Sequence, residues 1–252
     1  MDHVIYEGVA LPPADLRPCG RDFKTDRHWL GSARSEADRL VRDLALTSGS
    51  QVLDIGCGPG RLAVGIVDRL GIIEAYRGLD VDRRVIDWST RYITTDHPTF
   101  QFLHLDVSNP RYNPGGRSLN GGVSFGFRDE RFSIIYLYSV FSHMVERDVR
   151  IYLKEIARLL APEGRIFMTG FIEENVPEMT ANPDEYGRDW KGPLHQVRFE
   201  RDFFESMLDE SGLSVDRFDH GIEDNGQSAL YASRKRAGDA RLVRQAGGRR
   251  GA

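Results

Sequence analysis

The sequence predicts an α/β fold built on a mostly parallel sheet. The apolar run 52–55 is typical of a buried strand, glycines follow it at once, and residues 61–70 carry a helical pattern. Strand-like and helix-like segments then alternate as far as residue 233. The 252 residues, 40% hydrophobic and 29% charged, have the size and composition of one soluble globular domain.

Composition excludes several classes of protein. No stretch approaches the ~20 apolar residues of a membrane span, and residues 1–10 lack the basic and apolar parts of a secretory signal. The cysteines are Cys19 and Cys57, so we expect no disulfide framework and a reducing, cytoplasmic location. Cysteines and histidines show no zinc-type spacing, so no metal site is predicted, although a divalent metal requirement stays open.

Charge is divided unevenly along the chain. The net charge is −4, but residues 234–252 hold seven Lys and Arg residues against Asp239, so residues 1–233 are strongly acidic. An acidic body disfavours a nucleic-acid substrate, which wants a basic groove. We therefore expect one domain over 1–233 and a disordered basic tail over 234–252, with a nucleic-acid-binding arm as the weaker alternative.

Two segments precede the first strand. Residues 1–25 contain several prolines and are predicted to form an extended arm. Residues 26–47 carry apolar side chains at intervals of three and four, which predicts a helix that residues 48–50 close. This helix is expected to lie over the ligand site as a lid. Trp29 is assigned to the core, with a ligand contact as the alternative.

Gly56, Gly58 and Gly60 separate the first strand from its helix. Glycines accept positive φ and let the backbone approach a ligand, and a helix N-terminus offers unpaired N–H groups. The spacing G-x-G-x-G differs from the G-x-G-x-x-G of dinucleotide loops. With Asp54 and Pro59 it resembles motif I of the class I methyltransferases that use S-adenosylmethionine (SAM). The resemblance implies that the loop holds the methionine end of SAM and that Asp54 helps to fix its amino group.

The second predicted strand, 74–80, ends in Asp80. A carboxylate at this place can accept hydrogen bonds from both ribose hydroxyls. The resemblance gives Asp80 this role and places Val81 beside the adenine. Asp82 is the competing candidate, although it suits the N-cap of a helix over 83–92 better.

Asp106 and Val107 follow the third predicted strand, 100–105. In the family that the motif resembles, an aspartate here recognises the adenine amino group, which is a hydrogen-bond donor. We assign Asp106 and Val107 to the cofactor site. The alternative for Asp106 is a turn aspartate.

Two long segments, 108–128 and 171–198, interrupt the alternation of strands and helices. The first is rich in Gly and Asn and longer than ordinary connections, and Arg111, Tyr112 and Asn113 are its candidate acceptor contacts. The second holds aromatic and proline residues and is predicted to cap the acceptor pocket.

Tyr138 directly follows the fourth predicted strand, 132–137. It therefore lies at the carboxyl end of the strand, where open parallel sheets bind their ligands. We assign Tyr138 to the cofactor. His143 is the candidate general base, because a neutral imidazole accepts a proton near pH 7. A packing or binding role for His143 is the alternative, and His195 is a weaker candidate base.

A helix over 147–160, a strand over 165–170, a helix over 200–211 and strands over 213–218 and 228–233 complete the predicted chain. This order resembles the seven-stranded Rossmann-like sheet of class I methyltransferases, in which the last strand runs antiparallel.

The resemblance implies a SAM-dependent methyltransferase. Residues 112–116 and 138–144 look like a bacterial group of O-methyltransferases, including actinobacterial enzymes that act on sugars and small molecules. We predict O-methylation of a sugar or similar small polar acceptor; a lipid or polyketide hydroxyl, or an amine, is the alternative. Alternatives of another class are an inactive SAM-binding module and a nicotinamide (NAD)-dependent oxidoreductase, which the glycine spacing disfavours. The expected partner is a small molecule or glycan, with no membrane or nucleic acid, and a homodimer stays open.

Overall fold

A computed structural model describes residues 3–18, 20–119, 122–187, 189 and 192–236. Its central sheet has the strand order β10-β11-β7-β6-β3-β4-β5. Neighbours from β5 to β7 run parallel, whereas β11 is antiparallel to both β7 and β10. The predicted α/β sheet with an antiparallel last strand is therefore confirmed. The strands are β3 (Gln51–Ile55), β4 (Ala75–Asp80), β5 (Phe100–His104), β6 (Phe132–Leu137), β7 (Leu160–Glu173), β10 (Leu213–Asp219) and β11 (Ser228–Arg234).

The sheet gains two strands that the sequence did not predict. β7 continues past Gly170, and its last residues pair in parallel with β9 (Val197–Glu200), which pairs in turn with β8 (Met179–Ala181). Phe171 and Phe199 are buried, so apolar packing supports the added strands. The second insertion is therefore anchored to the main sheet at its ends.

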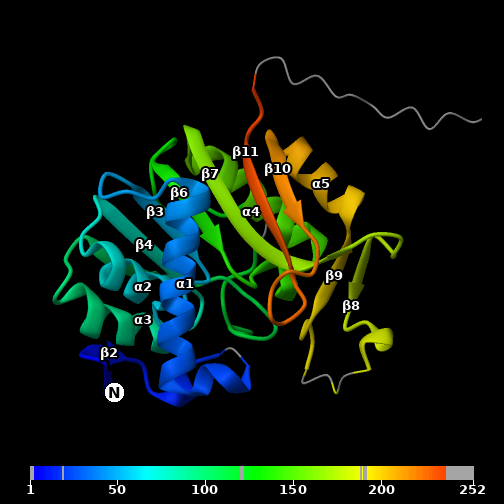
Figure 1. Cartoon of the computed structure of the whole chain (residues 1–252). Helices are drawn as coiled ribbons and strands as arrows, with labels where there is room; N and C mark the ends of the chain where they lie inside the picture. Colours follow the sequence, from blue (N-terminus) through cyan, green and yellow to red (C-terminus); the bar gives the residue numbers. More distant parts are fainter. Residues whose placement is uncertain (1–2, 19, 120–121, 188, 190–191, 237–252) are drawn as a thin grey trace, which may run out of the picture.

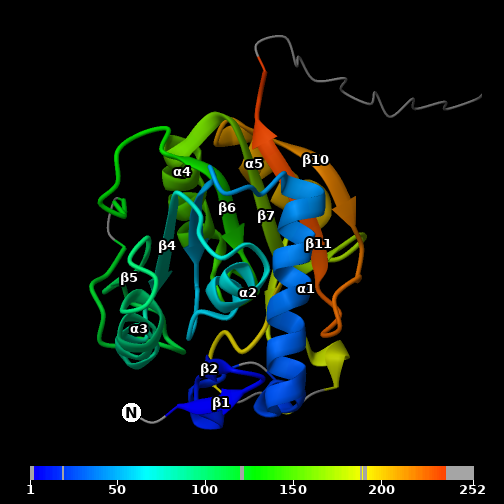
Figure 2. The ribbon, with the colours of Figure 1, turned by 60° about the vertical axis from the view of Figure 1, so that its left-hand side comes forward.

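Helices cover both faces of the sheet (Figures 1 and 2). One face carries α1 (Asp26–Leu44), α2 (Arg61–Leu70) and α3 (Arg83–Ser89), and the other carries α4 (Glu146–Leu159) and α5 (Arg201–Glu210).

A hydrophobic core lies on each face of the sheet. Successive side chains of a strand point to opposite faces, so they alternate between these two cores. On β3, Val52 faces the core under α1 to α3 and Leu53 faces the core under α4 and α5. On β6, Tyr136 and Leu137 alternate in the same way. Because both faces are covered, the strands at the centre of the sheet are mostly apolar on both sides, which explains why 52–55 could be recognised as a buried strand although it contains Asp54.

The helix α1 lies tightly against α2. A Cβ atom added to Gly65 of α2 would stand 2.0 Å from the carbonyl oxygen of Ala33 in α1, so the two backbones touch. The helix ends at Ala45, which adopts a left-handed conformation with φ 56°, a few residues before the predicted stop. Trp29 is 2% exposed and belongs to the core, as the sequence indicated.

The N-terminal arm is more ordered than an extended segment. It forms a hairpin of β1 (Val4–Tyr6) and β2 (Val9–Leu11), followed by short 3₁₀ helices at Ala14–Leu16 and Arg21–Lys24. Figure 2 shows the hairpin at the base of α1. The buried Arg17 guanidinium donates to the Pro12 carbonyl at 2.7 and 2.9 Å and to Asp26 at 2.6 Å, which ties the arm to the start of α1.

Other helix and strand boundaries differ from the predicted ones where one regular structure runs directly into the next. The helix predicted over 83–92 is α3 followed by a π-helical turn at Thr90–Thr94. The strand predicted over 165–170 begins at Leu160, and its pairing with β6 shifts register before Arg165. The Pro162-Glu163-Gly164 stretch therefore forms an irregularity inside β7. The predicted disordered tail lies, from residue 237 on, outside the described residues.

Candidate active site

The glycine loop has the backbone geometry that its sequence requires. Gly56, Gly58 and Gly60 have φ values of 73°, 51° and 74°, in the left-handed region that favours glycine. The Gly56 and Cys57 N–H groups donate to the Leu79 carbonyl at 2.7 and 3.0 Å. These bonds fix the loop to the end of β4 and leave it at the carboxyl edge of the sheet, where ligands of open parallel sheets bind.

Asp80 joins the loop to the second strand. Its carboxylate accepts from the Gly58 N–H at 2.8 Å and from the Asp82 N–H at 2.9 Å. Burial raises the pKa of Asp80, and these backbone hydrogen bonds oppose the rise. Each carboxylate oxygen keeps a further lone pair, so the group can still accept from ribose hydroxyls. Asp82 accepts from the Arg84 N–H at 2.9 Å and is the N-cap of α3.

Asp54 is a buried acid with one unsatisfied oxygen. It is 2% exposed and accepts a hydrogen bond from the Tyr76 hydroxyl, while its Oδ1 has no hydrogen-bond partner among the described residues. Burial raises the pKa of Asp54 to about 7, against the opposing effects of Tyr76 and the positive Arg61. An orphaned carboxylate oxygen directly before the glycine loop is an acceptor that a bound ammonium group would satisfy.

Asp106 is directed toward the first insertion. Its Oδ1 accepts from Asn113 Nδ2 at 3.3 Å, and its Oδ2 lies 3.6 Å from the Arg117 guanidinium. Val107 is buried and forms an isolated bridge with Arg117. The Val81 carbonyl lies 3.0 Å from His104 Nε2. The structure thus brings Asp54, Asp80 and the loop together, whereas Asp106 contacts the insertion.

Tyr138 belongs to a half-buried polar cluster around Glu223. Its hydroxyl donates to Glu223 at 3.1 Å, and the Arg61 guanidinium lies 4.7 Å from its ring centroid. Arg39 donates to both oxygens of Glu223, at 2.7 and 3.3 Å. Burial and the negative Glu223 raise the pKa of Tyr138.

Glu223 and Glu36 are site residues that sequence reasoning missed. Glu36 accepts from the Tyr136 hydroxyl at 2.7 Å and lies 3.7 Å from Arg39. An acid on the apolar stripe of the first helix was a signal available in the sequence. Glu223 lies in the β10–β11 turn and carries no such signal.

A cavity of about 520 Å³ opens beside this cluster. It lies between α1, the start of α2 and the β10–β11 turn. Its lining includes Gly31, Ser35, Arg39, Arg61, Tyr138 and Glu223. The position of Arg61, which follows the glycine loop, places the cavity next to the loop. His143 does not line it.

His143 lies where the two insertions meet. Its Nδ1 donates to the Leu194 carbonyl at 3.1 Å, and the ring of Tyr112 packs edge-on at a centroid distance of 5.3 Å. Because a carbonyl only accepts, Nδ1 carries the proton and Nε2 keeps its lone pair. Burial lowers the pKa of His143 to about 4, so the imidazole is neutral at pH 7.

Two acids of the second insertion, Glu173 and Glu174, are engaged in a hydrogen bond and an ion pair. Glu173 accepts from the Tyr186 hydroxyl at 2.5 Å, and Glu174 pairs with Arg201 at 2.8 Å. Within the described residues, His, Cys, Asp and Glu form no group of three or more that could hold a metal ion. None of the helices in the described part of the chain has both the length and the apolar character needed to span a membrane.

A glycine loop between a parallel strand and a helix, with a carboxylate at the end of the next strand, defines a Rossmann-like nucleotide-binding protein. Comparison with known proteins narrows the class. A family model described as "Methyltransferase domain" matches residues 53–166. The O-methyltransferase rstn1 of Aspergillus nomiae is 28% identical over 193 residues, which are 71% of this chain and 78% of the relative.

Two further matches agree with this one. The methyltransferase GfsG of Streptomyces halstedii is 25% identical over 54% of this chain and 42% of its own length. The magnesium protoporphyrin IX methyltransferase of Synechocystis PCC 6803, solved with bound SAM, aligns with a TM-score of 0.54 at 14% identity, over 86% of each chain. The sheet order is therefore that of the class I SAM-dependent methyltransferase fold, and the central part of the chain is similar in sequence to methyltransferases.

Proposed function

We propose that this protein transfers a methyl group from SAM to a hydroxyl oxygen of a small polar acceptor. The observation that carries the proposal is the glycine loop at the carboxyl edge of the sheet, held by the Asp80 carboxylate. The loop and Asp54 would hold the methionine end of the cofactor and Asp80 would accept from its ribose. The remaining proposed cofactor contacts are Val81, Asp106, Val107 and Tyr138.

His143 is the proposed general base. Methyl transfer from a sulfonium is an in-line displacement, in which the protein aligns donor and acceptor and removes the acceptor proton. With the proton on Nδ1, the neutral imidazole would take the acceptor proton at Nε2. A pKa of about 4 makes the imidazole a weak base, so the proton would move as the methyl group transfers and not before. The name of the Aspergillus relative supports oxygen as the acceptor atom.

A sugar or similar hydroxyl compound is the proposed acceptor. The residue Tyr112 is 40% exposed, its ring packs against His143, and the Arg111 guanidinium lies 5.3 Å from the ring centroid. A partly exposed aromatic residue among polar groups suits a sugar, which combines hydroxyls with an apolar ring face. The cavity beside Tyr138 is the competing place for the acceptor; it has a polar lining next to the loop, but neither His143 nor Tyr112 lines it.

The test has two stages. Thermal unfolding with S-adenosylhomocysteine (SAH) or NAD identifies the cofactor: SAH should raise the melting temperature, whereas protection by NAD alone would support an oxidoreductase instead. Methyl-labelled SAM is then supplied with oligosaccharides, hydroxylated lipids and polyketides, or amines. Label in an oligosaccharide supports the proposal. Label only in an amine overturns O-methylation, and binding of SAH without transfer to any acceptor supports a silent module.

A further inference from the structure

Ser139 has a backbone conformation that is unusual for its residue type. It follows Tyr138 directly, at the end of β6, and its φ is 60°. Non-glycine residues at positive φ are uncommon, and they persist where the surrounding structure holds them. The contacts of Ser139 identify what holds it.

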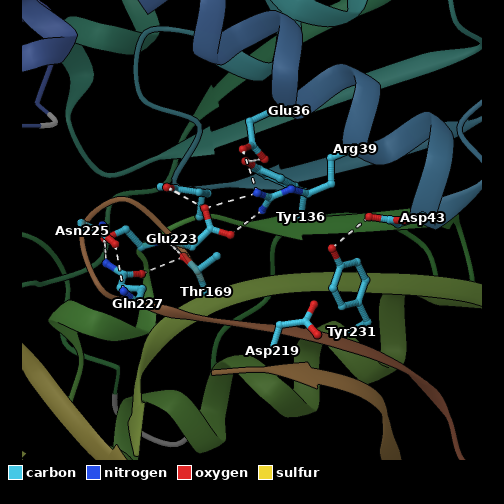
Figure 3. Close-up of polar contacts among 12 residues, drawn as sticks. Glu36, Arg39, Asp43, Tyr136, Thr169, Asp219, Glu223, Asn225, Gln227 and Tyr231 are labelled. Carbon is cyan, nitrogen blue, oxygen red and sulfur yellow. Dashed lines mark hydrogen bonds and ion pairs between the residues drawn. The ribbon is translucent and has the colours of Figure 1, made fainter. Parts of the chain in front are cut away.

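A closed ring of hydrogen bonds surrounds Ser139. Its N–H donates to Thr169 Oγ1 at 2.8 Å, Thr169 Oγ1 donates to Gln227 Oε1 at 2.7 Å, and Gln227 Nε2 donates to Ser139 Oγ at 2.6 Å. Thr169 and Gln227 are each 1% exposed. Figure 3 shows Gln227 reaching Thr169 from the β10–β11 turn. The ring therefore connects the end of β6, the middle of β7 and the start of β11.

Gln227 is itself held in place by its own turn. The Glu223 N–H donates to the Gln227 carbonyl at 3.0 Å, and the Gly226 N–H donates to the Glu223 carbonyl at 2.7 Å. The Gln227 N–H donates to Asn225 Oδ1 at 3.0 Å. The amide of Gln227 is therefore presented to Ser139 from a fixed backbone.

The conformation of Ser139 decides where Val140 lies. Val140 Cγ2 occupies the space that a Cβ at Gly56 would need, at 2.6 Å from that position. Val140 thus packs directly on the first glycine of the loop, whose N–H binds the Leu79 carbonyl. A shift of the backbone at Ser139 would move Val140 against the loop or away from it.

We propose that Gln227 is a positioning residue for the cofactor loop. It holds Ser139 in the left-handed conformation, and Ser139 in turn seats Val140 on Gly56. That the loop binds SAM rests on the proposed function. The chain of contacts that leads from Gln227 through Ser139 and Val140 to Gly56 does not depend on it.

Calorimetric titration of the full chain with SAH tests the route. Gln227→Leu removes both hydrogen bonds of the amide at similar volume, and we expect SAH affinity to fall at least tenfold. Adding Ser139→Gly should restore affinity to within about threefold of wild type, since glycine adopts positive φ without support. Gln51→Leu is the matched control: it removes one side-chain hydrogen bond, to Glu74, at the other end of β3, and should change affinity less than twofold.

Two outcomes would overturn the inference. One is an unchanged affinity in Gln227→Leu, and the other is a further loss when Ser139→Gly is added, which would mean that the backbone conformation is not the route. If Gln227→Leu does not fold, Ser139→Gly and Ser139→Val decide the question. Glycine should keep wild-type affinity and the β-branched valine should lose it, and equal affinities would refute the route.

A readout without ligand separates this inference from the proposed function. Hydrogen exchange of the Gly56 amide, which binds the Leu79 carbonyl, should be at least tenfold faster in Gln227→Leu than in Gln51→Leu. Failure of wild type to bind SAH would overturn the proposed function. Equal exchange in the two variants would overturn the positioning role.

Discussion

The Gly58 N–H donates a 2.8 Å hydrogen bond to the carboxylate of Asp80, so the middle glycine of the loop and the end of β4 form one unit. The same carboxylate also accepts from the Asp82 N–H. Asp80 therefore shapes the loop, and in the proposed function it also presents oxygens to the cofactor. Asp82 has a local task, the capping of α3.

Asp80→Ala should lower SAH affinity at least 100-fold, since it removes charged acceptors for the ribose and the loop contact, each worth about 1.5–3 kcal/mol. Asp82→Ala is the control. It should cost about 1 kcal/mol of stability through the lost cap and leave affinity within threefold. Titration calorimetry and thermal unfolding measure both quantities. A larger loss of affinity in Asp82→Ala would reverse the assignment.

Asp54 should couple cofactor binding to proton release. Burial raises its pKa to about 7, so the ligand-free protein holds a proton there in roughly half of the molecules at pH 7. A bound ammonium group favours the ionised carboxylate, and SAH binding should release protons near pH 7. Calorimetry in two buffers with different ionisation enthalpies measures the release, and Asp54→Asn should abolish it.

The stability of the ligand-free protein should show the matching dependence on pH. A carboxyl whose folded pKa lies above its ordinary value of 3.8 stays protonated when the unfolded chain is already ionised. The contribution of Asp54 to stability therefore decreases as pH rises from about 4 to 7. Asp54→Asn should flatten this part of the curve, and an unchanged slope would contradict the buried neutral acid.

The sequence predicts the loop and Asp80 because their contacts lie within one strand–helix–strand unit, whose geometry is local. It does not predict Glu223 and Gln227, because β11 returns antiparallel beside β7 and brings a motif-free turn to the end of β6. The surroundings of His143 were equally hidden, since its partner Leu194 comes from an insertion without regular pattern. Long-range polar contacts depend on the whole topology, not on local spacing.

His143→Ala should reduce turnover at least tenfold and leave SAH affinity within twofold, if the imidazole takes the acceptor proton. The pH profile adds a stricter condition. Because burial lowers the pKa of His143 to about 4, the active neutral form persists from pH 8 to 6 and disappears only near pH 4. His97→Ala serves as the control. His97 lies in the turn before β5, well before His143 in the sequence, so the variant should keep full turnover. A rate that declines already at pH 6.5 would point to another base.

Gly65→Ala should destabilise the protein by about 3 kcal/mol, because the added Cβ would meet the Ala33 carbonyl oxygen at 2.0 Å and force α1 away from α2. Gly31→Ala, in the helix α1 that packs on α2, is the control. Outside the local backbone of α1, no atom of the described residues lies within 4 Å of its added Cβ, so helix propensity should raise stability by about 0.5–1 kcal/mol. Chemical denaturation gives both values. Equal effects of the two substitutions would show that α1 and α2 are not in backbone contact.

Gly31→Leu tests whether the 520 Å³ cavity holds the acceptor. Gly31 lines the cavity, and the open space around its added Cβ leaves room for a side chain that fills the cavity without disturbing α1. We expect the KM of the labelled acceptor to rise at least tenfold, with kcat and SAH affinity within threefold, because occupied volume excludes the acceptor alone. Gly31→Ala, which fills little of the space, should leave KM nearly unchanged. A loss of SAH affinity instead would assign the cavity to the cofactor, and no change in either would exclude the cavity from the site.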